Sequence, residues 1–134
     1  MAERISALLR RSVGHLADEV PDSYQLVLDK LGTLVVALDV DGDLFTLSAG
    51  QGLEVIDGPS DSAGATIATS RAAILDVLDA RVGLQEAVEA GAVSVRGSLD
   101  DVLRTHDTLL AYVHAAVRAP SQPELLAALR TESP

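Results

Sequence analysis

Three aspartates at alternate positions, Asp39, Asp41 and Asp43, have the spacing with which a calcium-binding loop begins. Such a loop needs glycine at its sixth position and glutamate at its twelfth, and this chain has leucine and glycine there. The Asp-Gly pair at 41–42 instead favours a tight hairpin turn, because both central residues of that turn can need positive φ. We therefore expect a polar hairpin tip and no calcium site.

The histidines do not have the spacing of a zinc site. His15, His106 and His114 are the chain's only histidines, and the last two are two helical turns apart, whereas zinc-binding pairs on a helix favour a spacing of four. The chain has no cysteine, so thiolate ligands, disulfides and thiol nucleophiles are excluded. We expect no metal and no cofactor.

Three serines are the remaining candidate nucleophiles. Ser70, Ser94 and Ser98 all lie outside the G-x-S-x-G pattern of a nucleophile elbow. Ser70 and Ser98 each precede a helical pattern, where a serine hydroxyl caps the first turn. Catalysis therefore has no supporting motif, and we expect a protein that is not an enzyme.

Three arginines leave two interpretations open. Arg71, Arg81 and Arg96 could bind a carboxylate or phosphate on a ligand, because a guanidinium group suits both. The alternative is that they offset neighbouring acids on a solvated surface. We favour the second interpretation because the chain carries 20 acidic residues.

Composition excludes several classes of function. The net charge of −10 repels nucleic-acid phosphates and anionic headgroups, and the only aromatic residues are Tyr24, Phe45 and Tyr112. We therefore expect no nucleic-acid partner. There is no long apolar run and no signal-peptide pattern at the N-terminus, so we predict a cytoplasmic protein without stable membrane insertion. The 134 residues are 48% hydrophobic, which is enough for one domain with an aliphatic core.

The candidate residues are positioned by an alternation of helical and strand patterns. Periodicity and turn residues predict helices over 2–18, 22–30 (with Asp22 or Ser23 as N-cap), 70–78, 84–90, 99–118 and 121–130. They predict strands over 33–39, 44–48, 53–57, 65–69 and 92–96. A lone strand at 92–96 must join the sheet built earlier, because its backbone groups need partners. The order predicts an α+β fold: a single five-stranded curved sheet covered on one face by helices.

Alternation along the strands assigns the two faces of this sheet. The inward face is expected to carry Leu34, Val36, Leu38, Phe45, Leu47, Leu53, Val55, Ile67, Val93 and Val95. The outward face is expected to carry Asp39, Thr46, Ser48, Glu54, Thr66, Ser94 and Arg96. The long helix 99–118 is expected to turn inward the face formed by Val102, Leu103, Leu109, Leu110, Val113 and Val117.

From Gly32 onward the pattern resembles the sterol carrier protein superfamily of type two. The segment GTLVVALDVDGDLFTLSAGQGLEV is similar to that family's opening hairpin and third strand. ATIATSRAAILDVL resembles its short strand leading into a helix, and LQEAVEAGAVSVRGSLDDVLR resembles its helix, last strand and final helix. The resemblance covers roughly residues 22–115. It implies an apolar tunnel between sheet and helices that holds a sterol, fatty acid or acyl-CoA.

The resemblance divides the single domain (1–134) into N-terminal helices (1–31), a sterol-carrier-like core (32–118) and a C-terminal tail helix (119–134). The implied function is non-enzymatic binding or carriage of a small apolar lipid ligand. The cavity lining predicted from the inward face and the short helix 84–90 is Val36, Leu38, Phe45, Leu47, Val55, Ile67, Leu84, Val88, Val93 and Val95.

An alternative function remains open, because a filled core would use the same residues as a hollow one. The chain would then be an interaction module that docks a protein partner or forms a homo-oligomer through its C-terminal helices. Its docking stripe would be Leu109, Leu110, Val113 and Val117, followed by Leu125, Leu126 and Leu129.

Overall fold

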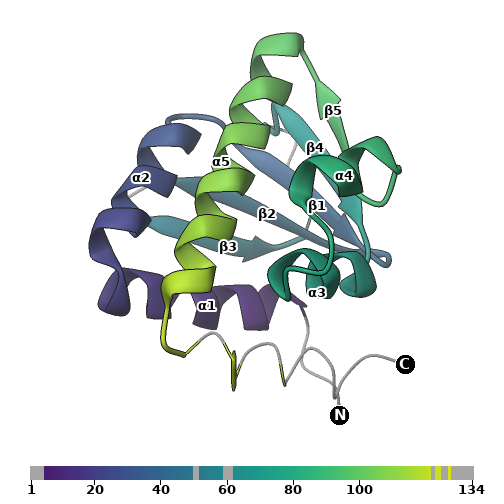
Figure 1. The fold of residues 1–134 in the computed structure, drawn as a ribbon. Helices are drawn as coiled ribbons and strands as arrows, with labels where there is room; N and C mark the ends of the chain where they lie inside the picture. The colour runs from purple at the N-terminus through teal and green to yellow at the C-terminus, as the bar shows by residue number, and fades with distance from the viewer. Residues whose placement is uncertain (1–4, 50–51, 59–61, 122, 125–126, 128–134) are drawn as a thin grey trace.

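The computed structural model describes residues 5–49, 52–58, 62–121, 123–124 and 127. Its helices are α1 (Ile5–Glu19), α2 (Pro21–Leu31), α3 (Arg71–Leu78), α4 (Leu84–Glu89) and α5 (Leu99–Arg118). Its strands are β1 (Val36–Val40), β2 (Asp43–Ala49), β3 (Leu53–Asp57), β4 (Ala65–Thr69) and β5 (Ser94–Gly97). In Figure 1, α5 crosses in front of the sheet, with α2 on one side, α3 and α4 on the other and α1 along the lower edge. The predicted α+β class is confirmed.

The strands form one open sheet in the order β3-β2-β1-β4-β5. Only the central pair, β1 and β4, is parallel; β1–β2, β2–β3 and β4–β5 are antiparallel. The last strand, β5, therefore satisfies its backbone by adding to β4 at the sheet edge.

The Asp-Gly turn forms as predicted. Val40 pairs with Asp43, which leaves a two-residue loop in which Asp41 has φ 53° and Gly42 has φ 87°. The Asp39 carboxylate accepts a hydrogen bond from the Gly42 N–H (2.9 Å), and the Asp41 carboxylate accepts one from the Arg71 N–H (3.0 Å). Two of the three aspartates thus hold the turn and the first residue of α3.

Helix starts agree with the sequence in two places and differ in one. Ser70 caps α3 by accepting from the Ala73 N–H (3.1 Å), and Ser98 caps α5 by accepting from the Asp101 N–H (3.2 Å). The predicted Asp22 or Ser23 cap for the second helix is wrong. That helix begins at Pro21, whose fixed φ and missing N–H suit the first helical position.

The last strand lies slightly later than predicted. Residues 92–93 are not in β5, because the N–H groups of Ala92 and Val93 both donate back to the Ala87 carbonyl at the end of α4 (2.9 and 3.2 Å). The first strand is also later than predicted, starting at Val36.

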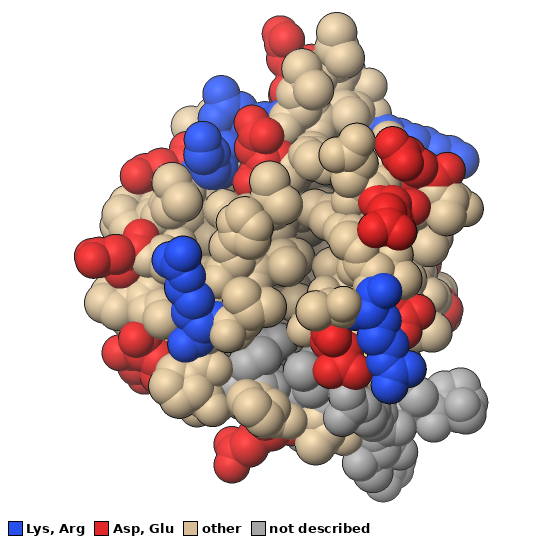
Figure 2. All heavy atoms as spheres, in the orientation of Figure 1, with Lys and Arg blue, Asp and Glu red and all other residues tan. Residues whose placement is uncertain are grey.

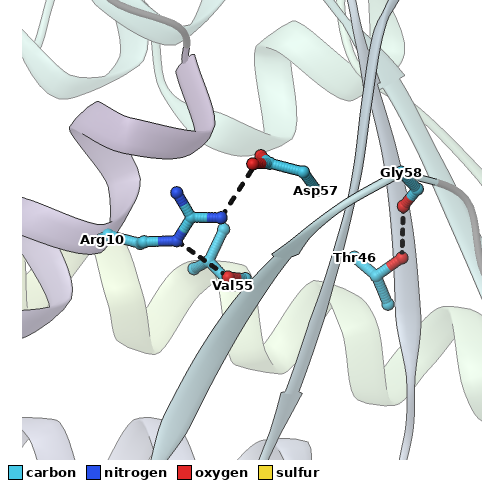
Figure 3. Close-up of polar contacts among 5 residues, drawn as sticks. All are labelled: Arg10, Thr46, Val55, Asp57 and Gly58. Atoms are coloured by element: carbon cyan, nitrogen blue, oxygen red, sulfur yellow. Dashed lines mark hydrogen bonds and ion pairs between the residues drawn. The ribbon is translucent and has the colours of Figure 1, made fainter.

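The predicted inward face is confirmed. Leu34, Val36, Phe45, Leu53, Val55, Ile67 and Val93 are buried in the core, and Leu38, Leu47 and Val95 pack against it. One outward residue is not exposed as expected: Thr46 is only 4% exposed. Thr46 lies beside Ile56 on the outer face, and its hydroxyl donates to the Gly58 carbonyl (2.9 Å; Figure 3), so its polar group is satisfied.

The predicted inward face of the long helix is right for Leu109 and Val113, which pack against the core, and wrong for three other residues. Leu103, Leu110 and Val117 are exposed, and the buried residues of α5 are small ones: Thr105, Thr108, Ala111, Ala115 and Ala116. Both threonine hydroxyls donate to the carbonyl four residues earlier, in bonds of 2.7 and 2.8 Å, so they can be buried without an unmet hydrogen bond. The predicted helix over 121–130 falls largely outside the described residues.

Polar contacts hold α1 against two other parts of the chain. The Arg10 guanidinium donates to the Val55 carbonyl (2.9 Å) and pairs with Asp57 (3.2 Å), which fixes the helix to the edge strand β3 (Figure 3). At the other end, the Glu19 carboxylate accepts from the N–H (3.0 Å) and the hydroxyl (2.5 Å) of Ser121. These contacts place α1 beside the inner sheet face.

Candidate ligand-binding cavity

An apolar cavity of about 160 Å³ lies between the inner sheet face and the helices. In Figure 2 the surface between α5 and the α3–α4 pair is hollowed and tan, with charged groups around it. Several lining side chains are only half-buried, among them Leu9, Ile74, Leu78 and Leu109. The cavity therefore reaches the surface.

Six of the ten residues predicted to line a cavity do so: Leu38, Phe45, Leu47, Ile67, Leu84 and Val93. They come from β1, β2 and β4, the start of α4 and the turn before β5. Alternation along the predicted strands found five of them, and Leu84 followed from the short helix 84–90. Ligand binding by these residues stays a prediction.

The other four, Val36, Val55, Val88 and Val95, do not line the cavity. Val36 is 1% exposed and Val55 is 8% exposed, so both are buried in the core without bordering the cavity. Val88 and Val95 pack against that core from its margin. Strand alternation gives the face on which a side chain lies, and the covering helices decide where that face is left uncovered.

Apart from Leu53 of β3 and Thr69 of β4, the rest of the lining comes from helices that cover the sheet. These side chains are Ile5, Leu8, Leu9, Ser12 and Val13 of α1, Val27 of α2, Ala73, Ile74, Val77 and Leu78 of α3, and Thr108, Leu109, Tyr112 and Val113 of α5. The apolar stripe of α1 was visible in the sequence as a helical period, but nothing in the stripe shows that it faces a void. Leu109 and Val113, assigned to a docking stripe, belong to the cavity instead.

The lining carries few polar groups. The Thr69 hydroxyl donates to the Ala92 carbonyl and the Thr108 hydroxyl to the Arg104 carbonyl (both 2.8 Å), so each donor is already used. Ser12 and Tyr112 form a short hydrogen bond with each other across the α1–α5 contact. Burial raises the pKa of Tyr112 to about 12, although the Ser12 hydrogen bond opposes the shift. The phenol is therefore neutral at ordinary pH.

The residues that could have carried other chemistry lie elsewhere. None of the three arginines, three histidines and three serines considered above lines the cavity. Arg81 pairs with Asp79 (3.2 Å) on the surface, as the surface interpretation expects. Within the described ranges, no cluster of three His, Cys, Asp or Glu residues could hold a metal ion. No helix in the same ranges is long and apolar enough to cross a bilayer.

A second depression of about 450 Å³ lies at the opposite end of α5, between its first turns and the loops before β1 and β4. It is more open and more polar than the first, with Asp101 and Arg104 in its wall. Arg104 donates to the Lys30 carbonyl (3.2 Å). None of the ten predicted lining residues reaches this depression, so we place the candidate site in the apolar cavity.

Comparison with solved structures identifies the architecture. No family model matches the chain, and no curated protein sequence matches it. The "UbiJ-SCP2 ubiquinone synthesis protein" superposes with a TM-score of 0.60 at 16% identity, covering 80% of this chain and 95% of that one. The chain has the fold of sterol carrier protein 2.

Two further structures share this sterol carrier protein 2 fold. The "sterol carrier protein domain 2" of Helicoverpa armigera gives a TM-score of 0.56 at 13% identity, covering 84% of this chain and 94% of that one. A Thermus thermophilus protein described as possibly a sterol carrier protein gives 0.54 at 16% identity, covering 87% and 90%. The resemblance noted in the sequence is therefore confirmed for the fold.

Proposed function

We propose that this protein binds and carries a small apolar lipid in the cavity between its sheet and its helices. The observation that carries the proposal is the cavity itself, which is lined almost entirely by aliphatic side chains from α1, α3, α5 and the inner sheet face. The fold shared with sterol carrier proteins supports the same function.

The cavity volume limits how much of a lipid fits inside. An apolar cavity of roughly 150 Å³ is large enough for benzene, whereas pockets for larger ligands measure about 300–1,000 Å³. At about 160 Å³ this cavity holds one ring or a short run of methylenes. A longer chain extends through the mouth or displaces the half-buried lining residues. Each methylene removed from water contributes about 0.8 kcal/mol to binding.

The proposed role is carriage without catalysis. The lining hydroxyls of Thr69 and Thr108 are engaged with backbone carbonyls, and no acid, base or nucleophile pair is found among the described lining residues. A cytoplasmic location belongs to the same proposal and rests on composition alone.

Two substitutions of the same kind test the cavity. Val93→Phe places a ring in the cavity that Val93 lines, and Val36→Phe places the same ring at a buried position outside it. We expect Val93→Phe to abolish hexane binding, measured by NMR titration of the methyl groups, with little change in melting temperature. Val36→Phe should overpack the core, at a cost of about 1–3 kcal/mol in the free energy of unfolding.

The opposite pattern would contradict the proposal. If the unmutated protein binds neither hexane nor any longer lipid, and Val93→Phe destabilises it as much as Val36→Phe does, the space is ordinary packed core. Native mass spectrometry of the purified protein adds an independent measurement, because a carrier retains lipid and a docking module appears as an oligomer.

One observation favours the alternative of an interaction module. Four apolar side chains along the outer face of α5 are exposed: Leu99 by 73%, Leu103 by 55%, Leu110 by 38% and Val117 by 55%. Substituting Leu103 and Val117 by glutamine leaves the cavity unchanged. A shift of an oligomer to monomer in these variants would support docking through α5.

A further inference from the structure

The four hydroxyl-bearing side chains of the cavity differ in how many hydrogen-bond donors they have left. Those of Thr69 and Thr108 each donate to a backbone carbonyl. Ser12 and Tyr112 share one hydrogen bond, in which either oxygen can be the donor. Two hydroxyls carry two hydrogens and this bond uses one of them. The second O–H has no other partner among the residues that the structure describes.

The position of this pair makes the spare donor useful to a ligand. Ser12 is 6% exposed, and both side chains line the cavity. A buried donor without a partner loses the hydrogen bonds that water would give it. An oxygen atom on a molecule in the cavity would restore that bond. The phenol keeps its proton at ordinary pH, because burial raises the pKa of Tyr112 to about 12.

The charge distribution disfavours an ionised ligand group beside the Ser12–Tyr112 pair. The described residues that line the cavity include no lysine, arginine or histidine, so a carboxylate inside would have no cation to pair with. The net charge of −10 also disfavours the approach of an anion to the protein as a whole. A fatty-acid carboxylate or a coenzyme A phosphate must therefore stay outside in water.

We propose that the ligand is a neutral lipid with a hydrogen-bond-accepting oxygen, such as a ketone, quinone, ester or alcohol, and that the Ser12–Tyr112 pair binds this oxygen. This assignment rests on the proposed function, since it names the class of ligand for the same cavity. If the pair served only as a structural link between α1 and α5, the affinity for a ligand would not depend on whether the ligand carries such an oxygen.

A series of probes with the same six-carbon chain tests the assignment: hexane has no oxygen, methyl hexanoate has a neutral accepting oxygen, and hexanoate has a charged one. Dissociation constants are measured by NMR titration at neutral pH. The unmutated protein should bind methyl hexanoate more tightly than hexanoate. In the double variant Ser12→Ala with Tyr112→Phe, the affinity for methyl hexanoate should fall by roughly fivefold, the equivalent of one hydrogen bond. The affinity for hexane should stay unchanged.

Two single variants separate recognition from structure. Ser12→Ala breaks the link between the helices but leaves the Tyr112 hydroxyl free to donate, so binding of methyl hexanoate should be retained even if the melting temperature falls. Thr108→Val is the matched control, because it removes a lining hydroxyl whose hydrogen is already used. It should leave the ratio of the methyl hexanoate and hexane constants unchanged.

The outcomes are distinguishable. Suppose that hexane binds to the unmutated protein. The assignment would be overturned, with the carrier function intact, if hexanoate bound as tightly as methyl hexanoate. It would also be overturned if the double variant weakened the binding of hexane and of methyl hexanoate equally. Absence of binding by every probe and by longer lipids as well would overturn the carrier function, and the assignment with it.

Discussion

The Tyr24 hydroxyl determines how β3 begins. Its oxygen accepts a hydrogen bond from the Leu53 N–H (2.9 Å), the first amide of the edge strand. The residue before it is Gly52, and a Cβ there would lie 2.7 Å from that same oxygen. Glycine at this position therefore leaves room for the close approach of a side chain from α2. The sequence shows only a glycine-rich turn.

This contact predicts a strong coupling between two substitutions. Gly52→Ala should push the phenol away and cost about 1 kcal/mol in the free energy of unfolding, and Tyr24→Phe should cost a similar amount by removing the acceptor. The double variant should cost little more than either single one, because both remove the same hydrogen bond. Chemical denaturation of the four proteins measures the cycle; simple additivity of the two losses would show that the contact is not formed.

At the scale of the element, β5 is framed by two glycines with different constraints. Gly91 has φ 79°, and a Cβ there would meet nothing within 4 Å. Gly97 has φ 154°, and a Cβ would lie 2.7 Å from the Gly64 carbonyl oxygen, a backbone atom beside β4. The first glycine ends α4, and the second lets β5 approach its partner strand.

Substitution by alanine at these two positions should therefore destabilise the protein by unequal amounts. Gly91→Ala meets only the left-handed backbone, and we expect a loss of about 1–2 kcal/mol in the free energy of unfolding. Gly97→Ala combines backbone strain with a steric clash against the backbone, and we expect a loss of about 3 kcal/mol or more in the free energy of unfolding. Thermal melts and denaturant titrations compare them. Equal losses would mean that β5 does not approach β4 as closely as described.

The contact between Glu19 of α1 and Ser121, which follows α5, predicts a dependence of stability on pH. The Ser121 hydroxyl and N–H lower the pKa of Glu19 below its usual 4.5; the nearby His15 also lowers it, and burial raises it. Because the native pKa is lowered, the contribution to stability is complete above about pH 4.5 and is lost as pH falls through the native value.

Glu19→Gln should accordingly lower the melting temperature at neutral pH, and its difference from the unmutated protein should shrink as the pH falls below about 4.5. The control is Asp18→Asn, which removes one charge from an exposed neighbour on the same helix. The melting temperatures of Glu19→Gln and of the unmutated protein are compared across this pH range. If their difference stays constant, the carboxylate contact adds no stability.

At the scale of the whole molecule, truncation of the C-terminal segment tests whether its leucines contribute to stability or to oligomer formation. Leu125, Leu126 and Leu129 are predicted to pack on the domain or on a second copy. Ending the chain after Pro120 removes Ser121 as well, whereas ending it after Ser121 keeps the contacts with Glu19. The second truncation therefore isolates the leucines. It should lower the melting temperature or change the oligomeric state; no change in either would show that the leucines do not pack.

The sequence by itself determined the order of the elements and most of the face assignments. Local interactions act over a few residues, so the Asp41-Gly42 turn, the Ser70 and Ser98 caps and the strand alternation could all be derived without a fold. The inward positions of Phe45, Ile67 and the residues like them followed from the period of two. The family-like pattern supplied the architecture that joins them.

Only the tertiary structure decided where the inner face is filled and where it is hollow. Val36 and Leu38 alternate identically along β1, yet the first is enclosed by core and the second lines the cavity. The same holds for α5, which turns alanines and threonines toward its neighbours and exposes Leu103 and Leu110. Hydrophobicity shows that a side chain can be buried, but helix positions set by packing across the chain decide what lies opposite it. The meeting of Ser12 with Tyr112, 100 residues apart, has that same origin.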